Sequence, residues 1–216
     1  MSSGGTSNPN PYIKSALITG VTRRLLPDRR KQIGWALSEL LDRVGYIQFL
    51  FGKTGEDNFL GSSIPAEYTQ TGHIDHCYVD MGNTKSVKDG VKRIAERGYN
   101  RVIFNIHYDN KLSVEAQFKS IVLHHWLIAR HVLSKVNPLA NIENKFITLL
   151  PDELGLANPV DPSDFPSDMS GMNGLFVNSA GLTRDAARPS IRLALIAMAQ
   201  HLSRFTRVSA FVMYPE

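Results

Sequence analysis

Short apolar runs alternate along this chain with longer segments in which apolar residues recur every three or four positions. The short runs are rich in β-branched and aromatic residues and are bounded by glycine, proline or polar residues, a pattern typical of buried strands. Strands are therefore predicted at residues 13–19, 46–51, 76–79, 101–105, 146–150 and 208–213. The periodic segments predict amphipathic helices at residues 33–44, 83–98, 113–133 and 185–205, the second capped by Asn83 or Thr84.

Each predicted helix has an apolar face that we expect to pack against the strands. In the first helix this face comprises Ile33, Ala36, Leu37, Leu40 and Leu41. In the second it comprises Val87, Val91 and Ile94, and in the third Phe118, Ile121, Val122, His125, Ile128, Ala129, Val132 and Leu133. In the fourth it comprises Leu193, Ile196, Ala197 and Leu202.

Strands that are apolar throughout, with amphipathic helices between them, are typical of a parallel sheet covered on both faces. The prediction is a single α/β domain over residues 12–216, with a doubly wound, Rossmann-like parallel sheet of about six strands, after a disordered tail at residues 1–11. Segments 52–72 and 155–175 are predicted to be mostly loop. In such a sheet, ligands bind beyond the carboxyl ends of the strands. That rim would comprise residues 20–31, 52–54, Asp80, 105–109 and 151–156.

The composition suits one globular domain in a reducing compartment. Of the 216 residues, 43% are hydrophobic, which allows a sizeable core. The single cysteine, Cys77, excludes an internal disulfide framework and is expected to be a buried strand thiol. No apolar run approaches the roughly 18 residues of a membrane-spanning helix, and residues 1–11 lack the basic and apolar regions of a signal peptide. We therefore expect a soluble, cytoplasmic protein.

Four segments of the chain, in order, resemble the short-chain dehydrogenases/reductases (SDRs). ALITGVTRR with QIGWALSELLDRVGY resembles their first strand, glycine turn and helix, and CYVDMGNTKSVKDGVKRIAERGYNRVIFN resembles their Asp-Val element, helix and Asn-Asn-Ala-Gly strand. KFITLLPDELGLA is similar to the strand that carries their catalytic serine, and LALIAMAQHLSRFTRVSAFVMYPE to their last helix and strand before Pro-Gly. The resemblance covers roughly residues 13–216 and implies the strand order 3-2-1-4-5-6 with a nicotinamide cofactor at the rim.

The cofactor loop departs from the family pattern. The family's first and last glycines lie six residues apart, whereas Gly20 and Gly34 are separated by 14 positions, and Gln32 stands where the middle glycine would be. The inserted residues are basic, so they are either a clamp for an anion such as the 2′-phosphate of NADP or a solvated loop. The resemblance implies a cofactor site at Gly20, Thr22, Arg23, Arg24, Ile33, Gly34, Lys53, Asp80, Met81 and Asn105.

The hydride-transfer residues of the family are replaced. By the resemblance, the family's asparagine falls near Ile121 and its serine near Asp152. Its tyrosine–lysine pair falls either on Arg188 and Arg192 or on Phe176 and Ala180. A phenyl ring cannot transfer a proton, and the pKa of arginine is too high for acid/base cycling near neutral pH. We therefore expect a binding or accessory protein, with NADP as a cofactor that is either retained or lost.

An enzyme is the alternative. His107, Tyr108 and Asp152 all lie on the predicted rim and are the candidate catalytic residues. They would serve an NADP-dependent oxidoreductase with relocated acid/base groups, or a non-redox dehydration, isomerisation or cyclisation.

Metal and nucleic-acid binding are not expected. The seven histidines show no spacing that brings three ligands together, so they are expected to be solvated or at interfaces. The net charge of +4 is only mildly basic, and the basic residues are not interleaved with aromatic ones.

Two predicted helices are candidates for a partner interface. By the resemblance, residues 113–133 and 185–205 correspond to the helices through which SDR subunits commonly associate, so a homo-oligomer or another protein partner is expected there. Trp126 and Phe205 would anchor such an interface, because large aromatic side chains dominate interface energetics. The alternative is that both side chains belong to the core.

Overall fold

The structure is a computed structural model that describes residues 14–21, 33–52, 74–94, 99–109, 111–135, 143–151, 154 and 184–213, with the side chains of 184–187 left out. The tail at residues 1–11, the loop predicted at 155–175 and all of the loop predicted at 52–72 except Gly52 lie outside these ranges.

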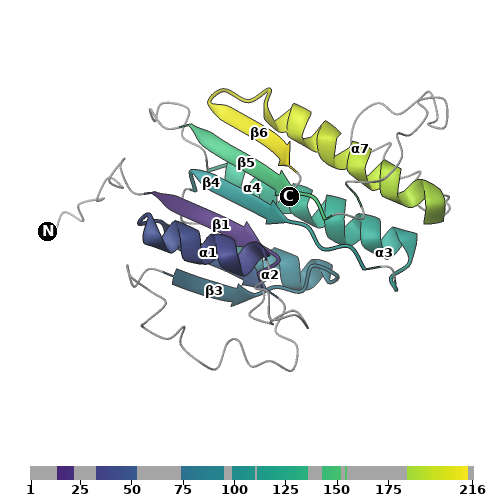
Figure 1. Cartoon of the computed structure of the whole chain (residues 1–216), viewed down its shortest axis with the longest axis horizontal. Helices are drawn as coiled ribbons and strands as arrows, with labels where there is room; N and C mark the ends of the chain where they lie inside the picture. Colours follow the sequence, from purple (N-terminus) through teal and green to yellow (C-terminus); the bar gives the residue numbers. More distant parts are fainter. Residues whose placement is uncertain are drawn as a thin grey trace, which may run out of the picture.

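Six strands form one parallel sheet (Figure 1). They are β1 (Ser15–Thr19), β2 (Ile47–Gly52), β3 (Ile74–Tyr78), β4 (Arg101–Asn105), β5 (Asn144–Leu149) and β6 (Val208–Met213). Their order across the sheet is β3-β2-β1-β4-β5-β6, and every neighbouring pair is parallel. The α/β class, the doubly wound sheet and the strand order expected from the sequence are confirmed.

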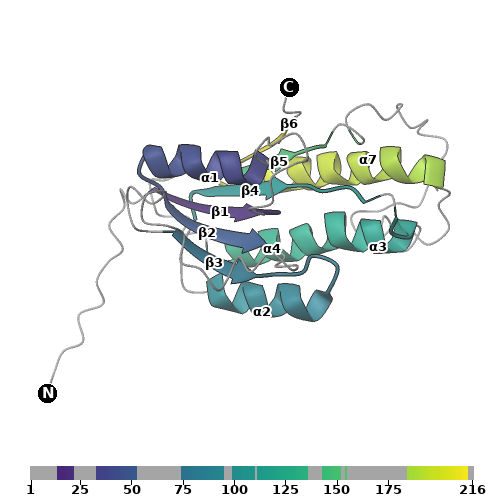
Figure 2. The same ribbon diagram turned by 60° about the horizontal axis from the view of Figure 1, so that its bottom comes forward.

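Helices cover both faces of this sheet. They are α1 (Ile33–Arg43), α2 (Thr84–Ile94), α3 (Val114–Phe118), α4 (His124–Leu133) and α7 (Arg184–Leu202). Figure 2 shows α1 on one face and α2 with α4 on the other. The prediction of one continuous helix over residues 113–133 was wrong in detail, because a π-helical turn at Lys119–Leu123 separates α3 from α4.

The core consists of two apolar clusters, one on each face of the sheet. Successive residues of a strand point to opposite faces, so Val102 and Phe104 of β4 enter one cluster and Ile103 enters the other. The smaller cluster, beneath α1, consists of Ile18, Val21, Trp35, Leu50, Ile103 and Leu149. The larger one joins the sheet to α2, α4 and α7, and includes the predicted inward residues of α2 and most of those of α3 and α4. Cys77 is buried in it, as predicted.

The buried face of α1 differs from the prediction. Ile33 and Leu40, expected in the core, are 43% and 56% exposed, and Ala36 is exposed as well. The residues that α1 buries are Gly34, Trp35, Ser38 and Asp42. Leu37 and Leu41, also on the predicted face, are partly buried and pack against the smaller cluster. The helix is turned so that Gly34 meets Gly20 and Asn105 at the sheet, with Trp35 buried next to it.

The buried face of α7 is also rotated from the predicted one. Leu193 is 38% exposed, whereas Leu202 is buried as expected. The residues that pack into the larger cluster are Ile191, Ala194, Leu195, Met198 and Leu202. The helix ends at Leu202 rather than at residue 205, so Phe205 lies beyond it.

Candidate functional site

The carboxyl ends of the parallel strands gather the described part of the predicted site at one edge of the sheet (Figure 1). Gly20 follows β1, Asp80 and Met81 follow β3, and Asn105 ends β4. The strand order reverses between β1 and β4, and open α/β sheets bind their ligands at such a switch point. Of the other predicted residues, Thr22, Arg23, Arg24, Lys53 and Asp152 lie outside the described ranges.

Gly20, Gly34 and Asn105 form a close three-way contact at the switch point. The Asn105 side chain donates a hydrogen bond from Nδ2 to the carbonyl oxygen of Gly20 at 2.9 Å. Gly20 has a φ of +66°, and a Cβ there would overlap the backbone oxygen of Asn105. A Cβ on Gly34 would lie 2.8 Å from Asn105 Nδ2 and 3.0 Å from the Gly20 oxygen. Gly34 therefore performs the close packing of the first helix against the sheet, despite the long interval from Gly20.

A second glycine contact joins β1 to β2 at the same edge. The Val21 amide donates to the Phe51 carbonyl at 3.0 Å, and the Val79 amide donates to the Gly52 carbonyl at 2.9 Å. A Cβ on Gly52 would overlap the carbonyl oxygen of Val21. The sequence placed Gly52 on the rim but gave it no role. Its role comes from a contact with a residue 31 positions earlier in the chain, which no local pattern reveals.

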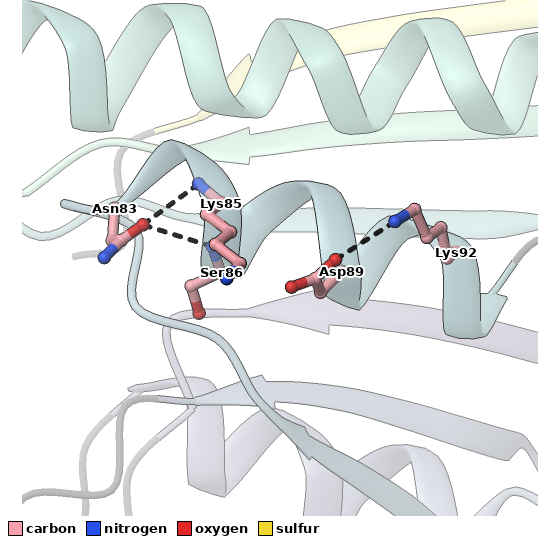
Figure 3. A network of polar contacts seen from close by, with 5 residues as sticks. All are labelled: Asn83, Lys85, Ser86, Asp89 and Lys92. Carbon is pink, nitrogen blue, oxygen red and sulfur yellow. Dashed lines mark hydrogen bonds and ion pairs between the residues drawn. The ribbon is translucent and has the colours of Figure 1, made fainter.

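Polar contacts shape the connection from β3 to α2. Asp80 Oδ1 accepts the Gly82 amide at 2.9 Å, and the Asp80 amide donates to Ser86 Oγ at 2.9 Å. Asn83 Oδ1 accepts the amides of Lys85 at 2.9 Å and Ser86 at 3.2 Å, as Figure 3 shows. Asn83 is therefore the helix cap, which decides between the two caps considered from the sequence.

Two consecutive histidines are buried beneath this edge. His125 was expected on the inward face of its helix, whereas His124 was expected to be solvated or at an interface. His124 contacts the Met81 carbonyl through Nδ1 at 2.5 Å and Thr84 Oγ1 through Nε2 at 3.0 Å. His125 contacts the Ile121 carbonyl through Nδ1 at 2.7 Å and Thr19 Oγ1 through Nε2 at 3.0 Å. Burial lowers the pKa of both rings, that of His125 to about 4.

The two described catalytic candidates have opposite environments. Tyr108 is 8% exposed and belongs to the larger core cluster, whereas the adjacent His107 is exposed. The guanidinium carbon of Arg188 lies 5.5 Å from the centre of the Tyr108 ring. The structure therefore does not present His107 and Tyr108 together to one ligand.

The described positions that correspond to the SDR catalytic residues also have other roles here. Ile121 is buried, and its carbonyl contacts the ring of His125. Arg188 and Arg192 lie on α7, the first exposed and the second partly buried. Phe176 and Ala180, the alternative pair, lie outside the described ranges.

The described residues contain no group of three or more histidine, cysteine, aspartate or glutamate side chains that could hold a metal ion. Within the same ranges, no helix combines the length and apolar character needed to cross a membrane. Burial raises the pKa of the Cys77 thiol, against an opposing effect of Arg93.

Solved structures with this arrangement include several dehydrogenases and reductases. An alcohol dehydrogenase from Thermococcus sibiricus, complexed with 5-hydroxy-NADP, matches with a TM-score of 0.60 and 18% identity over 94% of this chain and 76% of its own. The chain has the SDR fold. A short-chain glucose/ribitol dehydrogenase from Brucella melitensis matches with a TM-score of 0.61 and 14% identity, over 94% of this chain and 74% of that one.

A carbonyl reductase from Pseudomonas aeruginosa in complex with NADP also shares the SDR fold, with a TM-score of 0.60 and 13% identity over 94% of this chain and 82% of its own. At these identities the likeness concerns the fold. No family model matches the sequence, and no curated protein does.

Proposed function

We propose that this chain binds an NADP-type dinucleotide at the carboxyl ends of β1 to β4 and works as a binding or accessory protein without classical hydride transfer. The observation that carries the proposal is the contact of Gly20, Gly34 and Asn105 at the switch point. Glycine at these two positions keeps the turn after β1 and the start of α1 free of side-chain atoms, as a bound pyrophosphate requires. Two of the solved structures that share this fold are complexes with NADP or a derivative of it.

The residues of the rim fit the parts of such a ligand. Gly20 and Gly34 border the place where a pyrophosphate would approach the backbone, and Asp80 and Met81 follow β3 on the adenosine side. The rest of the proposed cofactor set is Thr22, Arg23, Arg24, Ile33, Lys53 and Asn105. Its basic members would supply the positive charge that a 2′-phosphate needs.

The proposal of lost hydride transfer rests on residue chemistry. Arg188 and Arg192, on the last helix, offer no phenol and no amine. The guanidinium group stays protonated near neutral pH and so cannot cycle as a general acid and base. A bound dinucleotide would then serve as a structural or regulatory ligand.

The test is a titration of the purified chain with NADPH and NADH, followed by nicotinamide fluorescence and thermal unfolding together. A Kd below about 100 μM, or roughly 5.5 kcal/mol of binding free energy, is expected for NADPH. A ligand at ten times its Kd stabilises the folded state by about 1.4 kcal/mol, so both signals should appear together. Replacing Arg23 and Arg24 with serine should lower the affinity for NADPH more than the affinity for NADH. No binding of either nucleotide at millimolar concentration would refute the proposal.

A second candidate is an enzyme in the same cleft, either an NADP-dependent oxidoreductase or a non-redox catalyst of dehydration, isomerisation or cyclisation. The observation in its favour is that His107 is exposed just after Asn105, where a proton-transfer group would meet a ligand. His107→Asn should then abolish turnover of a substrate found by screening, without changing NADPH affinity. Unchanged turnover would remove His107 from the mechanism.

We further propose that the chain forms a homo-oligomer, or binds another protein, through α3, α4 and α7. A row of three aromatic rings supports this surface. Trp126 and His201 have ring centres 5.3 Å apart, and His201 and Phe205 have ring centres 5.6 Å apart. Trp126 is partly buried against the core, whereas Phe205 is 44% exposed at the end of the row. Phe205 is therefore the proposed anchor.

A cytoplasmic location is also proposed. It is supported by the single cysteine, Cys77, whose buried thiol suits a reducing compartment. Labelling of the chain with a fluorescent fusion in its host would test it.

A further inference from the structure

The two buried histidines at the start of α4 point to different parts of the rim. The π-helical turn at Lys119–Leu123 ends immediately before His124. Successive residues of an α-helix are rotated by about 100°, so adjacent side chains reach different neighbours. His125 contacts Thr19 at the end of β1, and His124 contacts the connection that follows β3.

The contacts of His124 define how its ring is protonated. The Met81 carbonyl can only accept a hydrogen bond, so Nδ1 carries the proton and donates it. In the neutral ring Nε2 is then an acceptor, and the Thr84 hydroxyl donates to it. The ring is fully buried, and burial favours the neutral form. His124 thus holds two groups of the β3–α2 connection, one at each side of its turn.

Several hydrogen bonds of this connection are local. The bonds of Asp80 to Gly82 and Ser86, and those of Asn83 to the first turn of α2, lie within the connection and its own helix. They determine its shape. His124 lies 40 positions after Thr84 in the chain and ties that shape to α4.

We propose that His124 is a positioning residue for the adenosine half of the bound nucleotide. The inference rests on the proposed NADP-type ligand. In a doubly wound sheet the strands on one side of the switch point, here β1, β2 and β3, form one mononucleotide-binding half. Asp80 and Met81 close that half at its outer strand. By holding the Met81 carbonyl, His124 fixes the backbone position of the β3–α2 connection before the ligand binds. This lowers the free-energy cost of ordering that connection on binding.

Two conservative variants distinguish a positioning role of His124 from a general contribution to the stability of the fold. In His124→Asn the amide nitrogen is separated from Cα by the same number of bonds as Nδ1, so the donor to Met81 is kept. In His124→Gln the amide group instead reaches the place of Nε2, so the bond to Met81 is lost. His131→Gln, on the same helix but away from the rim, is the matched control. For each protein we would measure amide hydrogen exchange of residues 80–84 and the affinity for 2′,5′-ADP, which contains only the adenosine half.

We expect His124→Gln to speed amide hydrogen exchange at residues 80–84. It should also lower the affinity for 2′,5′-ADP about tenfold, in the range typical of residues that orient binding groups. The affinity of His124→Asn for 2′,5′-ADP should stay within about threefold of that of the wild type, and the affinity of His131→Gln should be unchanged. If the wild type binds 2′,5′-ADP and both His124 variants bind it equally well, the inference fails while the proposed function stands. If the wild type binds neither NADPH nor 2′,5′-ADP, both fail.

Discussion

Gly20 and Gly45 both adopt a positive φ, of +66° and +81°, yet their surroundings differ. A Cβ on Gly20 would overlap the Asn105 backbone, whereas nothing lies within 4 Å of one on Gly45. Gly45→Ala should therefore cost only the backbone strain, about 1 kcal/mol, and Gly20→Ala about 2 kcal/mol more because of the overlap. Urea unfolding of both variants measures the difference. An equal loss of unfolding free energy in the two variants would show that the structure relaxes around the added Cβ at Gly20 without cost.

The pH dependence of stability depends in part on His125. Its folded-state pKa of about 4 lies below the value of 6.5 for an unperturbed histidine, because burial disfavours the charged ring. Between these values the unfolded chain binds a proton that the folded chain does not. The contribution of His125 is therefore complete above pH 6.5 and is lost as the pH falls towards 4, by about 3 kcal/mol in total.

Urea unfolding at pH 7 and at pH 4.5 tests this prediction. His125→Phe is expected to have a lower stability at pH 7, because Thr19 loses its partner, but a smaller loss on acidification than the wild type. His107→Asn, which changes an exposed histidine, serves as the control. If His125→Phe loses as much stability between pH 7 and pH 4.5 as the wild type, other groups cause the pH dependence.

At the scale of elements, helix α2 offers a comparison between a cap at its first turn and an ion pair further along (Figure 3). Asn83→Ala removes the acceptor of two backbone amides and should cost about 1 kcal/mol. Lys92→Ala removes a salt bridge to Asp89 whose side chains are 78% and 53% exposed, so a change under about 0.5 kcal/mol is expected. Thermal unfolding of the two variants compares them directly. A larger loss in Lys92→Ala would contradict the ranking.

Helix α1 shows how an apolar pattern can predict an element and still misplace its buried face. The three-to-four spacing gave the helix correctly, but Trp35 is buried and Leu40 is not. The rotation of a helix about its axis depends on how closely it approaches the sheet. Here Gly34 sets that approach by its contact with Asn105, a residue 71 positions later.

At the scale of the whole molecule, the aromatic row of Trp126, His201 and Phe205 predicts an oligomer that one charge would disrupt. Phe205→Glu places a carboxylate at the proposed anchor and should convert a dimer into a monomer, because a buried unpaired charge is costly. Leu40→Glu changes another exposed apolar residue, on α1, and should leave the dimer intact. Sedimentation velocity decides the matter. A wild-type monomer would exclude the homo-oligomer, and dissociation by Leu40→Glu alone would show that the subunits associate through another surface.

The sequence alone determined the type and order of the elements, because periodicity and turn residues act locally on the backbone. The strands β4 and β6 were predicted with the bounds observed, and the strand order followed from the family resemblance. Gly20 and Asn105 were likewise placed at the rim by the motifs around them. The predicted site residues outside the described ranges, such as Arg23 and Asp152, stay predictions.

Tertiary structure decided the features that depend on residues far apart in the chain. The inward position of His125 was predicted from the apolar face of its helix, but the burial of His124 was not. The hydrogen-bond partners of both rings were not predicted either, because they lie at the end of β1 and beyond β3, far away in the chain. The same holds for the different environments of His107 and Tyr108, since Tyr108 is buried in the larger core cluster with Arg188 of α7 over its ring. Local patterns restrict backbone conformation, but the direction and surroundings of a side chain are set when the elements pack together.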